Sequence, residues 1–473
     1  MAHVSGARAA IAVRRERVSL SVSAANLLAE DAMGLAALVR TGAVSAEALA
    51  EAAIARIEAD ARTINAFADR ARLPARGPAK GLFAGVPFAI KNLNTFVEGC
   101  TASFGSARFA DRVAAADSAI VGRYRAAGFV ILGTTNSPEL SLSLSTESAL
   151  SGVTRHPCDP FGRYGVGGSS GGAAAAVAAG FVPAAHATDS AGSIRAPAAH
   201  TGLIGLKPTR GLTPLEPSLA ADPLTLTTAH AVTRTVRDSA ALLEVAAARS
   251  GLLDALGGSL SGRTVALVDP ARSGVAFSPA SCAAAEACAA ALSRLGLRVV
   301  GVPTPFRLSD LWPTLTRIIA RRTFAAVGDD PAGLEPVTAA LAALGAADHG
   351  SDPAPWASAI AAPLIALAAA HDFVLTPTLS VDAVPLGSLP MDASPAMHVA
   401  NLLTMGGFSS AYNVTGLPAI SLPFGALPGG VSVGAMVGAA AGRDAALLSL
   451  AAALEADGAF IGDAHRRLIG HSP

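Results

Sequence analysis

Apolar positions near the start of the chain follow a helical period. Between residues 31 and 58 they recur every three or four positions, which is typical of helices that bury one face. Gly42 interrupts the repeat, and Ser45 can cap a second helix after it. This stretch therefore predicts two consecutive helices.

Strand-like and helix-like stretches alternate through the rest of the chain. Short apolar runs predict strands at 86–90, 129–132, 264–268, 298–302 and 372–375. Amphipathic or Ala-rich stretches predict helices at 117–128, within 164–188, at 279–295 and after Gly442. Residues 305–370 are mostly helical in pattern and hold few motifs.

This alternation predicts an α/β fold. We expect a single large α/β/α domain with a mixed, mostly parallel central sheet covered by helices. No repeat or Pro/Ser-rich linker divides residues 31–473. Residues 1–30 are expected to form a disordered arm, because they are rich in Arg and lack the compact apolar region of a secretory signal.

Composition narrows the range of partners. Of 473 residues, 51% are hydrophobic and 15% are charged, and the formal net charge is +0. A neutral chain argues against nucleic acid or an anionic membrane surface, and Pro and Gly break every long uncharged run. We expect a small-molecule substrate, a cytoplasmic location and no nucleic-acid or membrane partner; a homodimer is left open.

The sequence shows no pattern typical of a metal site. Its four cysteines have no CxxC spacing and are interpreted as free thiols in a reducing compartment. His186, His200 and His398 lie in no metal-ligand pattern and are interpreted as ordinary polar residues. The G-x-S-x-G spelling occurs at 167–171 and 430–434, but neither stretch follows a predicted strand as a nucleophile elbow does, which disfavours a Ser-His-Asp triad.

Two Gly/Ser clusters, at 167–172 and 189–193, flank an Ala-rich run. Glycines let successive backbone N–H groups converge on an anion. A serine hydroxyl beside such N–H groups has what is needed to attack a carbonyl and to hold the resulting oxyanion. The clusters therefore predict acyl-transfer chemistry.

Lysine is rare, since only Lys80, Lys91 and Lys207 occur among 35 basic residues. Unlike arginine, lysine can lose its proton inside a protein. Lys91 ends the apolar run 86–90, and α/β sheets usually place their chemistry at the carboxyl ends of strands. Lys91 is therefore the candidate general base.

These motifs resemble the amidase signature family. The resemblance rests on GGSSGG at 167–172, the cluster 189–195, GLKPT at 205–209, a G-x-P-x-x-x-K pattern ending at Lys91, and FSSAYNVTGLPAISLP at 408–423. It runs from about residue 31 to residue 455, with motifs more specific than a single Gly-rich loop. Three positions depart from the family pattern: Ser190 replaces a Thr, Ala191 replaces a Gly, and Asn92 replaces an Asp.

The resemblance implies a Ser–Ser–Lys triad with an acyl-enzyme intermediate. Ser193 matches the nucleophile, Ser169 the bridging serine and Lys91 the base. Backbone N–H groups of the nucleophile turn would hold the oxyanion, including those of Ser190, Ala191 and Gly192. If residue 191 requires a positive φ, alanine there would be strained.

The substrate pocket is less well specified. Three residues are predicted to contact the substrate: Ser141, Thr146 and Gly168. Residues 305–370 are expected to shape the pocket, with Phe306, Trp312 and Phe324 as candidate wall residues if they do not pack in the core. The basic cluster Arg317, Arg321 and Arg322 is interpreted as a solvated helix face.

Three functional alternatives remain at this stage. The residues around 135–148 and 185–195 favour an amidase acting on apolar or cyclic amides, similar to the nylon-oligomer cyclic-dimer hydrolases. The chain could instead be the glutamine-hydrolysing A subunit of an aminoacyl-tRNA amidotransferase, or a catalytically inactive binding protein of the same fold. Asn92 has two interpretations: it lowers the pKa of Lys91 relative to an Asp, or it only hydrogen-bonds a nearby loop.

Overall fold

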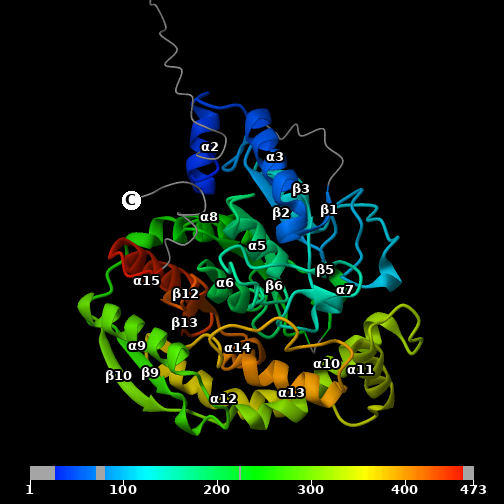
Figure 1. Cartoon of the computed structure of the whole chain (residues 1–473). Coiled ribbons are helices and arrows are strands. Elements are labelled where there is room, and N and C mark those ends of the chain that lie inside the picture. Colours follow the sequence, from blue (N-terminus) through cyan, green and yellow to red (C-terminus); the bar gives the residue numbers. More distant parts are fainter. Residues whose placement is uncertain (1–26, 71–79, 223–224, 462–473) are drawn as a thin grey trace, which may run out of the picture.

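A single large sheet runs through the molecule (Figure 1). The computed structural model describes residues 27–70, 80–222 and 225–461. The expected arm lies outside the described residues up to position 26, and the division into an arm and one domain stays a prediction. Eleven strands form the sheet, in the order β1-β3-β2-β6-β8-β7-β12-β13-β11-β9-β10.

The strands of this sheet are short and mostly buried. Their bounds are Phe67–Arg70 (β1), Pro87–Lys91 (β2), Val130–Thr135 (β3), Ala184–Asp189 (β6), Ile204–Lys207 (β7), Thr228–Thr233 (β8), Thr264–Asp269 (β9), Arg298–Pro303 (β10), Phe373–Pro377 (β11), Ala419–Ala426 (β12) and Ser432–Gly438 (β13). A separate two-stranded ribbon pairs Glu147–Ser148 (β4) with Gly152–Val153 (β5).

Helices cover both faces of the sheet. Those of the first half are Ala32–Arg40 (α2), Ala46–Ile64 (α3), Ala119–Ala126 (α4), Gly171–Ala178 (α5), Arg195–Thr201 (α6), Pro217–Ala220 (α7) and Val236–Ala247 (α8). Those of the second half are Pro279–Arg294 (α9), Trp312–Val327 (α10), Pro336–Ala347 (α11), Ala354–Ala370 (α12), Pro395–Gly406 (α13), Ser409–Thr415 (α14) and Asp444–Ala456 (α15).

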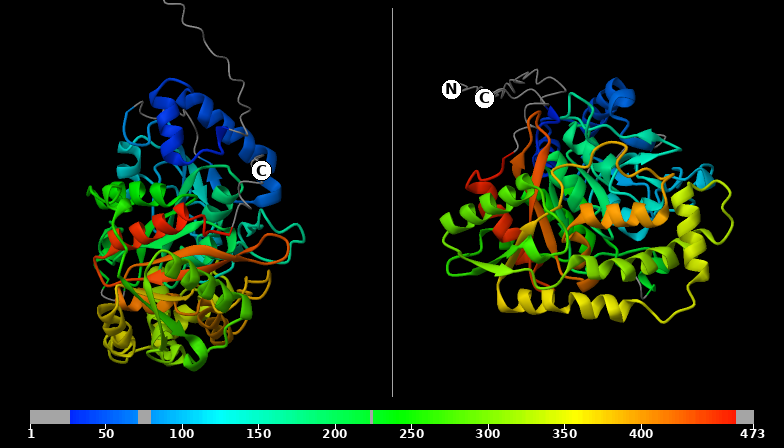
Figure 2. Two further views of the ribbon diagram at one scale, coloured as in Figure 1. Left: turned by 90° about the vertical axis from the view of Figure 1, so that its left-hand side faces the viewer. Right: turned by 60° about the horizontal axis from the view of Figure 1, so that its bottom comes forward.

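Alternation along β2 shows how the layers form. Phe88 and Ile90 pack in the hydrophobic cluster of α2 and α4, whereas Ala89 packs in that of α3 and α5. Neighbouring strand residues point to opposite faces, so one apolar strand serves two cores. The same holds near the other edge, where α9 and α15 cover one face and α10 and α12 the other. Figure 2 shows α2 and α3 far from this second helical layer.

The predicted α/β class is confirmed, but the predicted predominance of parallel pairing is wrong. Among the described residues six strand pairings in the large sheet are antiparallel and four are parallel. Parallel strands require a long crossover, usually through a helix. Only part of the chain has that arrangement: β12 and β13 are joined by residues 427–431, and the described residues between β7 and β8 include only the short helix α7.

The elements predicted from periodicity are present. The strand–helix–strand unit expected at 264–302 appears as β9, α9 and β10, with β9 and β10 parallel. The strands expected at 86–90 and 129–132 are β2 and β3. The strands β1, β6, β7, β8, β12 and β13 were not predicted from the sequence; β6 and β8 consist mostly of Ala, His and Thr, which give them little strand-like pattern.

Candidate active site

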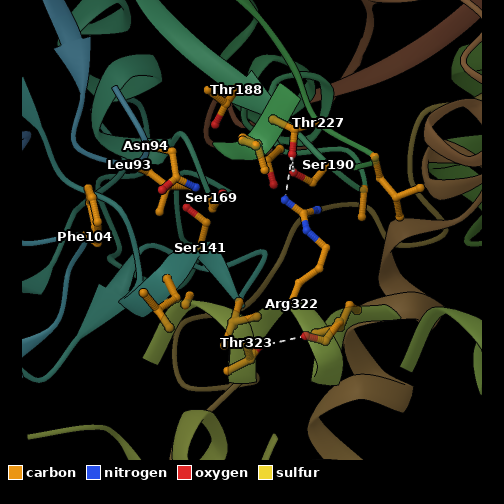
Figure 3. A pocket seen from close by; sticks show the side chains of 18 of the residues that line it. Leu93, Asn94, Phe104, Ser141, Ser169, Thr188, Ser190, Thr227, Arg322 and Thr323 are labelled. Atoms are coloured by element: carbon orange, nitrogen blue, oxygen red, sulfur yellow. Dashed lines mark hydrogen bonds between the residues drawn. The ribbon is translucent and has the colours of Figure 1, made fainter. Parts of the chain in front are cut away.

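A cavity of about 500 Å³ opens beside the carboxyl end of β2 (Figure 3). Segments far apart in sequence line it: Leu93, Asn94, Phe96, Phe104, Phe109, Arg112, Leu140, Ser141, Leu142, Ser143, Leu144, Ser169, Thr188, Ser190, Ala191, Ser193, Leu215, Glu216, Ser218, Leu219, Asp222, Leu226, Thr227, Leu315, Ile318, Ile319, Arg322, Thr323, Ala325, Ala326, Leu402 and Leu403. Its wall is mainly apolar, and serine and threonine side chains from several segments also line it. Such a cavity suits a small ligand of mainly apolar character.

Lys91 ends β2 behind this cavity. Its side chain is fully buried, and its Nζ donates to the Oγ of Ser169 at 2.7 Å. Burial lowers the pKa of Lys91 from 10.5 to about 7, although the negative charge of Asp189 partly opposes the shift. Burial disfavours the charged amine, so a large fraction of Lys91 is neutral near pH 7 and can accept a proton.

The two Gly/Ser clusters meet here through the backbone. The N–H of Ser170 donates to the carbonyl of Ser193 at 3.2 Å, and the hydroxyl of Ser170 donates to the carbonyl of Thr188 at 3.1 Å. Ser169 and Ser193 both line the cavity. The structure therefore brings together the three side chains expected from the sequence, on β2, before α5 and before α6.

Asp189 organises the turn that carries Ser193. This buried carboxylate accepts from the N–H of Gly192 at 2.8 Å and of Ile194 at 3.1 Å, and forms a fully buried ion pair with Arg195 at 2.8 Å. Burial alone would raise its pKa, but the Arg195 charge and the hydrogen bonds hold the pKa well below its usual range. The carboxylate therefore stays ionised and holds the turn closed.

Asn413 completes this support. It donates to Asp189 Oδ1 at 2.9 Å and accepts from Arg195 Nη2 at 2.7 Å. None of these three residues was given a role from the sequence. All three belong to the quoted motifs 189–195 and 408–423, where they are the only charged or amide side chains, and this was the available signal.

One expected oxyanion donor is already occupied. The N–H of Gly192 points to Asp189, so it cannot also point to a substrate oxygen in this arrangement. Within the described part of the chain, the N–H groups of Ser190, Ala191 and Ser193 donate to no protein acceptor. Gly192 serves the turn instead: its φ is +124°, and a Cβ there would lie 2.8 Å from the Cβ of Ser409.

Ala191 carries no backbone strain. It is absent from the described non-glycine residues with positive φ, so an L-residue fits the turn at this position. The departure from the family glycine is therefore accommodated. Ala191 itself lines the cavity.

Of the three predicted substrate contacts, only Ser141 lines the cavity. Its φ is +59°, and its Oγ is buried with no hydrogen-bond partner among the described residues. Thr146 lies behind the wall, where its hydroxyl donates to the carbonyl of Gly167 at 2.8 Å. Gly168 is also outside the lining; a Cβ there would come within 2.7 Å of the Leu144 carbonyl carbon. Its lack of a side chain serves close backbone packing.

Helix α10 forms the wall opposite the serines, but through other residues than expected. Phe306 and Trp312 pack at the edge of the core, and Phe324 is not among the lining residues. The lining face of α10 carries Leu315, Ile318, Ile319, Arg322 and Thr323. A helix turns only one stripe toward a cavity, and sequence alone does not say which stripe.

The interpretation of the basic cluster as a solvated face is wrong for Arg322. Arg317 and Arg321 pair with Asp348 at 2.9 and 2.8 Å, away from the cavity. Arg322 instead lines the cavity and pairs with Asp222 at 3.3 Å.

The hydrogen bonds of Asn92 favour the second of its two interpretations. Its Nδ2 donates to the Thr101 carbonyl and to Ser103 Oγ, both at 3.2 Å, and its Oδ1 accepts from the N–H of Phe104 at 3.3 Å. It therefore ties β2 to the loop that carries Phe104 into the cavity wall. No hydrogen bond joins the Asn92 and Lys91 side chains in the described structure.

None of His186, His200 and His398 lies where it could act as a general base at the cavity. His186 accepts from the N–H of Lys91 at 3.4 Å, and burial lowers the pKa of His186 and of His200 to about 3. Both nitrogens of His398 bond backbone carbonyls. The four cysteines are free thiols. None of these side chains lines the cavity.

The described residues contain no cluster of three His, Cys, Asp or Glu side chains arranged to hold a metal ion. Within the same ranges, none of the helices has both the length and the apolar character needed to cross a bilayer.

Known proteins share this architecture. The family model named Amidase matches residues 37–337. The 6-aminohexanoate-cyclic-dimer hydrolase of Paenarthrobacter ureafaciens is 33% identical, over 90% of this chain and 94% of its own length. The putative amidase AmiC of Mycobacterium tuberculosis (strain ATCC 25618 / H37Rv) is 36% identical, with the same coverage of 90% and 94%.

A solved structure agrees with these relatives. The 6-aminohexanoate cyclic dimer hydrolase complexed with substrate superposes with a TM-score of 0.83 at 32% identity, covering 91% of this chain and 97% of that one. The family match spans well over half of the chain, and the relatives extend over nearly all of it. The chain therefore belongs to the amidase signature family.

Proposed function

We propose that this chain hydrolyses a carboxylic amide through a Ser193–Ser169–Lys91 relay and an acyl-enzyme. The observation that carries the proposal is the 2.7 Å hydrogen bond between Lys91 Nζ and Ser169 Oγ, at a cavity that Ser193 also lines. A buried lysine with a pKa of about 7 is a suitable base at neutral pH.

The relay moves one proton at a time. Neutral Lys91 accepts the proton of Ser169, and Ser169 takes the proton of Ser193 as Ser193 Oγ attacks the amide carbonyl carbon. The resulting oxyanion is held by the free N–H groups of Ser190, Ala191 and Ser193. Collapse of this intermediate breaks the C–N bond, and the relay returns the proton to the departing nitrogen. Water then cleaves the acyl-enzyme by the same route.

The cavity favours an amide with apolar substituents. Its wall is built largely from Leu, Phe and Ile side chains, which gain free energy by covering apolar groups. Ser141, with its unpartnered hydroxyl, is the proposed polar contact on this wall. An apolar wall suits glutamine poorly, so the amidotransferase alternative is disfavoured. The relative that acts on the cyclic dimer of 6-aminohexanoate supports the same substrate class.

Several expectations from the sequence stay predictions. The enzyme is expected to need no metal or organic cofactor, to be cytoplasmic and to bind no nucleic acid, and a homodimer stays open. The inactive-protein alternative is also testable, since it predicts no turnover and no reaction with an active-site probe. The presence of Lys91, Ser169 and Ser193 at one cavity argues against it.

A fluorophosphonate probe tests the assignment of the nucleophile. The wild-type chain should be labelled on Ser193, and Ser193→Ala should abolish both labelling and amide hydrolysis. Ser218→Ala is the matched control, because Ser218 lines the same cavity on a different segment; it should keep labelling. An adduct mapped by mass spectrometry to Ser169, Ser170 or a cysteine would contradict the proposal.

A further inference from the structure

Arg322 brings a cationic side chain into an otherwise largely apolar wall. It projects from α10 toward Ser190 and Thr227, across the cavity from Leu93 and Phe104 (Figure 3). Its side chain is 22% exposed, so the guanidinium is mostly out of bulk water. A desolvated cation is costly unless its donors find acceptors, which raises the question of what they bind.

Only some of the N–H donors of this guanidinium have an acceptor among the described residues. Arg322 Nε pairs with Asp222 Oδ2 at 3.3 Å, and Nη2 donates to Thr227 Oγ1 at 3.3 Å. A guanidinium carries five N–H donors. Among the described residues Nη1 has no hydrogen-bond acceptor, and Arg322 lines the cavity. Donors therefore remain for an acceptor carried by a ligand.

The charges around Arg322 select the kind of acceptor. Asp222 neutralises the guanidinium, and the other charged lining residues are Arg112 and Glu216, one of each sign. A ligand carboxylate would approach both Arg322 and Asp222, so much of its attraction would be cancelled. A neutral carbonyl oxygen accepts from the free donors without this repulsion.

Two hydrogen bonds in series link Arg322 to the turn that carries Ser193. Ser190 Oγ lies 2.7 Å from Thr227 Oγ1, which accepts from Arg322, and Ser190 begins the turn that carries Ser193. A group bound by Arg322 can therefore belong to the same molecule as the scissile amide, with an apolar spacer lying against α10.

We propose that Arg322 is a specificity-determining residue that binds a second, neutral carbonyl group of the substrate, separated from the scissile amide by an apolar chain. This inference rests on the proposed function, since it names the substrate class of the same cavity. It predicts a preference for substrates with two carbonyl groups over substrates with one.

Three synthetic amides form the test. They share one scissile amide and one alkyl spacer and differ at the far end, which is a methyl ketone, an isopropyl group or a carboxylate. The ketone and isopropyl groups have nearly the same shape, and neither can be hydrolysed. Affinities are measured by calorimetry on Ser193→Ala, which cannot turn the amides over, and kcat/KM is measured on the active chain.

The ketone should bind about 10- to 100-fold more tightly than the isopropyl compound, as expected for a hydrogen bond from a charged donor. It should also bind more tightly than the carboxylate. In Arg322→Met and Arg322→Gln, each also built on Ser193→Ala, the ketone-to-isopropyl ratio should fall toward one. Arg321→Met is the matched control, since Arg321 pairs with Asp348 outside the cavity; it should keep the ratio.

Several results would overturn the inference: equal affinity for ketone and isopropyl compounds in the wild-type cavity, tightest binding of the carboxylate, no binding of the ketone, or a ratio that survives in both Arg322 variants. If both Arg322 variants lost affinity equally for the ketone and the isopropyl compound, Arg322 would only position Thr227 and Ser190. If the active chain hydrolyses none of the amides, the proposed function fails, while the calorimetric ratio still decides the role of Arg322.

Discussion

Replacing Lys91 by methionine should have opposite effects on stability and on activity. The folded chain buries this amine completely and lowers its pKa from 10.5 to about 7. Below pH 7 the amine is charged in both the folded and the unfolded chain, so the folded chain bears the full cost of burying the charge. One pKa unit corresponds to about 1.4 kcal/mol, so this cost is of the order of 5 kcal/mol.

The cost depends on pH in a defined way. As the pH rises from 7 to 10.5, the unfolded chain still holds the proton that the folded chain has lost, and the destabilisation shrinks. Above pH 10.5 both states are neutral and no cost remains. Lys91→Met loses the hydrogen bond to Ser169, worth about 1 kcal/mol. It should therefore be more stable than wild type at pH 6, by several kcal/mol, and lose this advantage by pH 10.

Activity should change in the other direction. For the wild type, kcat/KM should fall about tenfold per pH unit below pH 7 and level off above it, because only neutral Lys91 accepts a proton. Lys91→Met should lose about 10²- to 10⁴-fold in kcat/KM, and its remaining activity should lack this acid limb.

Two measurements on the same proteins check this: kcat/KM from pH 5 to 10, and the free energy of unfolding from urea titrations at pH 6 and pH 10. Lys80→Met is the control, since Lys80 is exposed; it should change neither quantity. A Lys91→Met chain with wild-type kcat/KM, or with an unchanged acid limb, would refute the role of Lys91 as the base. A variant less stable than wild type at pH 6 would refute the lowered pKa.

Two further substitutions test the surroundings of the triad. Asn92→Asp removes the amide donor to the Thr101 carbonyl, so the thermal midpoint should fall while the acid limb stays in place; a limb shifted upward by about one pH unit would instead support direct electrostatic coupling to the base. Asp189→Asn leaves the buried Arg195 charge without its partner and should cost about 3–5 kcal/mol of stability in urea titrations, with loss of fluorophosphonate labelling. Asp457→Asn breaks an exposed ion pair and should change little; a stable, labelled Asp189→Asn would contradict the scaffold role.

Much of the fold could be predicted because its information is local. Apolar runs gave β2, β3, β9 and β10 to within three residues at each end, and the Ala-rich stretch gave α9. The pairing direction could not be predicted in this way. A strand in a sheet buried on both faces looks alike whether its neighbour is parallel or antiparallel. Of the six antiparallel pairs described, only β7–β8 and β12–β13 join strands that follow one another in the chain, so most pairing directions depend on contacts between distant segments.

The residues of the proposed triad were only partly accessible from sequence. Lys91 could be singled out because it ends an apolar run, whereas Ser169 and Ser193 were chosen among the four serines of the two Gly-rich clusters through the family resemblance. Their meeting at one cavity was only implied by resemblance. The structure supplies the physical link, through the Lys91–Ser169 bond and the backbone bond from Ser170 to Ser193.

Sequence by itself thus determined many of the elements, the motif residues and the kind of chemistry, because periodicity and glycine-rich clusters act over a few residues. Tertiary structure alone decided where the side chains point. Asn92 faces the 101–104 loop, Asp189 occupies the N–H of Gly192, and Arg322 turns into the cavity although Arg321 beside it does not. These outcomes depend on packing between layers, and the partner of Arg322, Asp222, lies a hundred positions away in the chain.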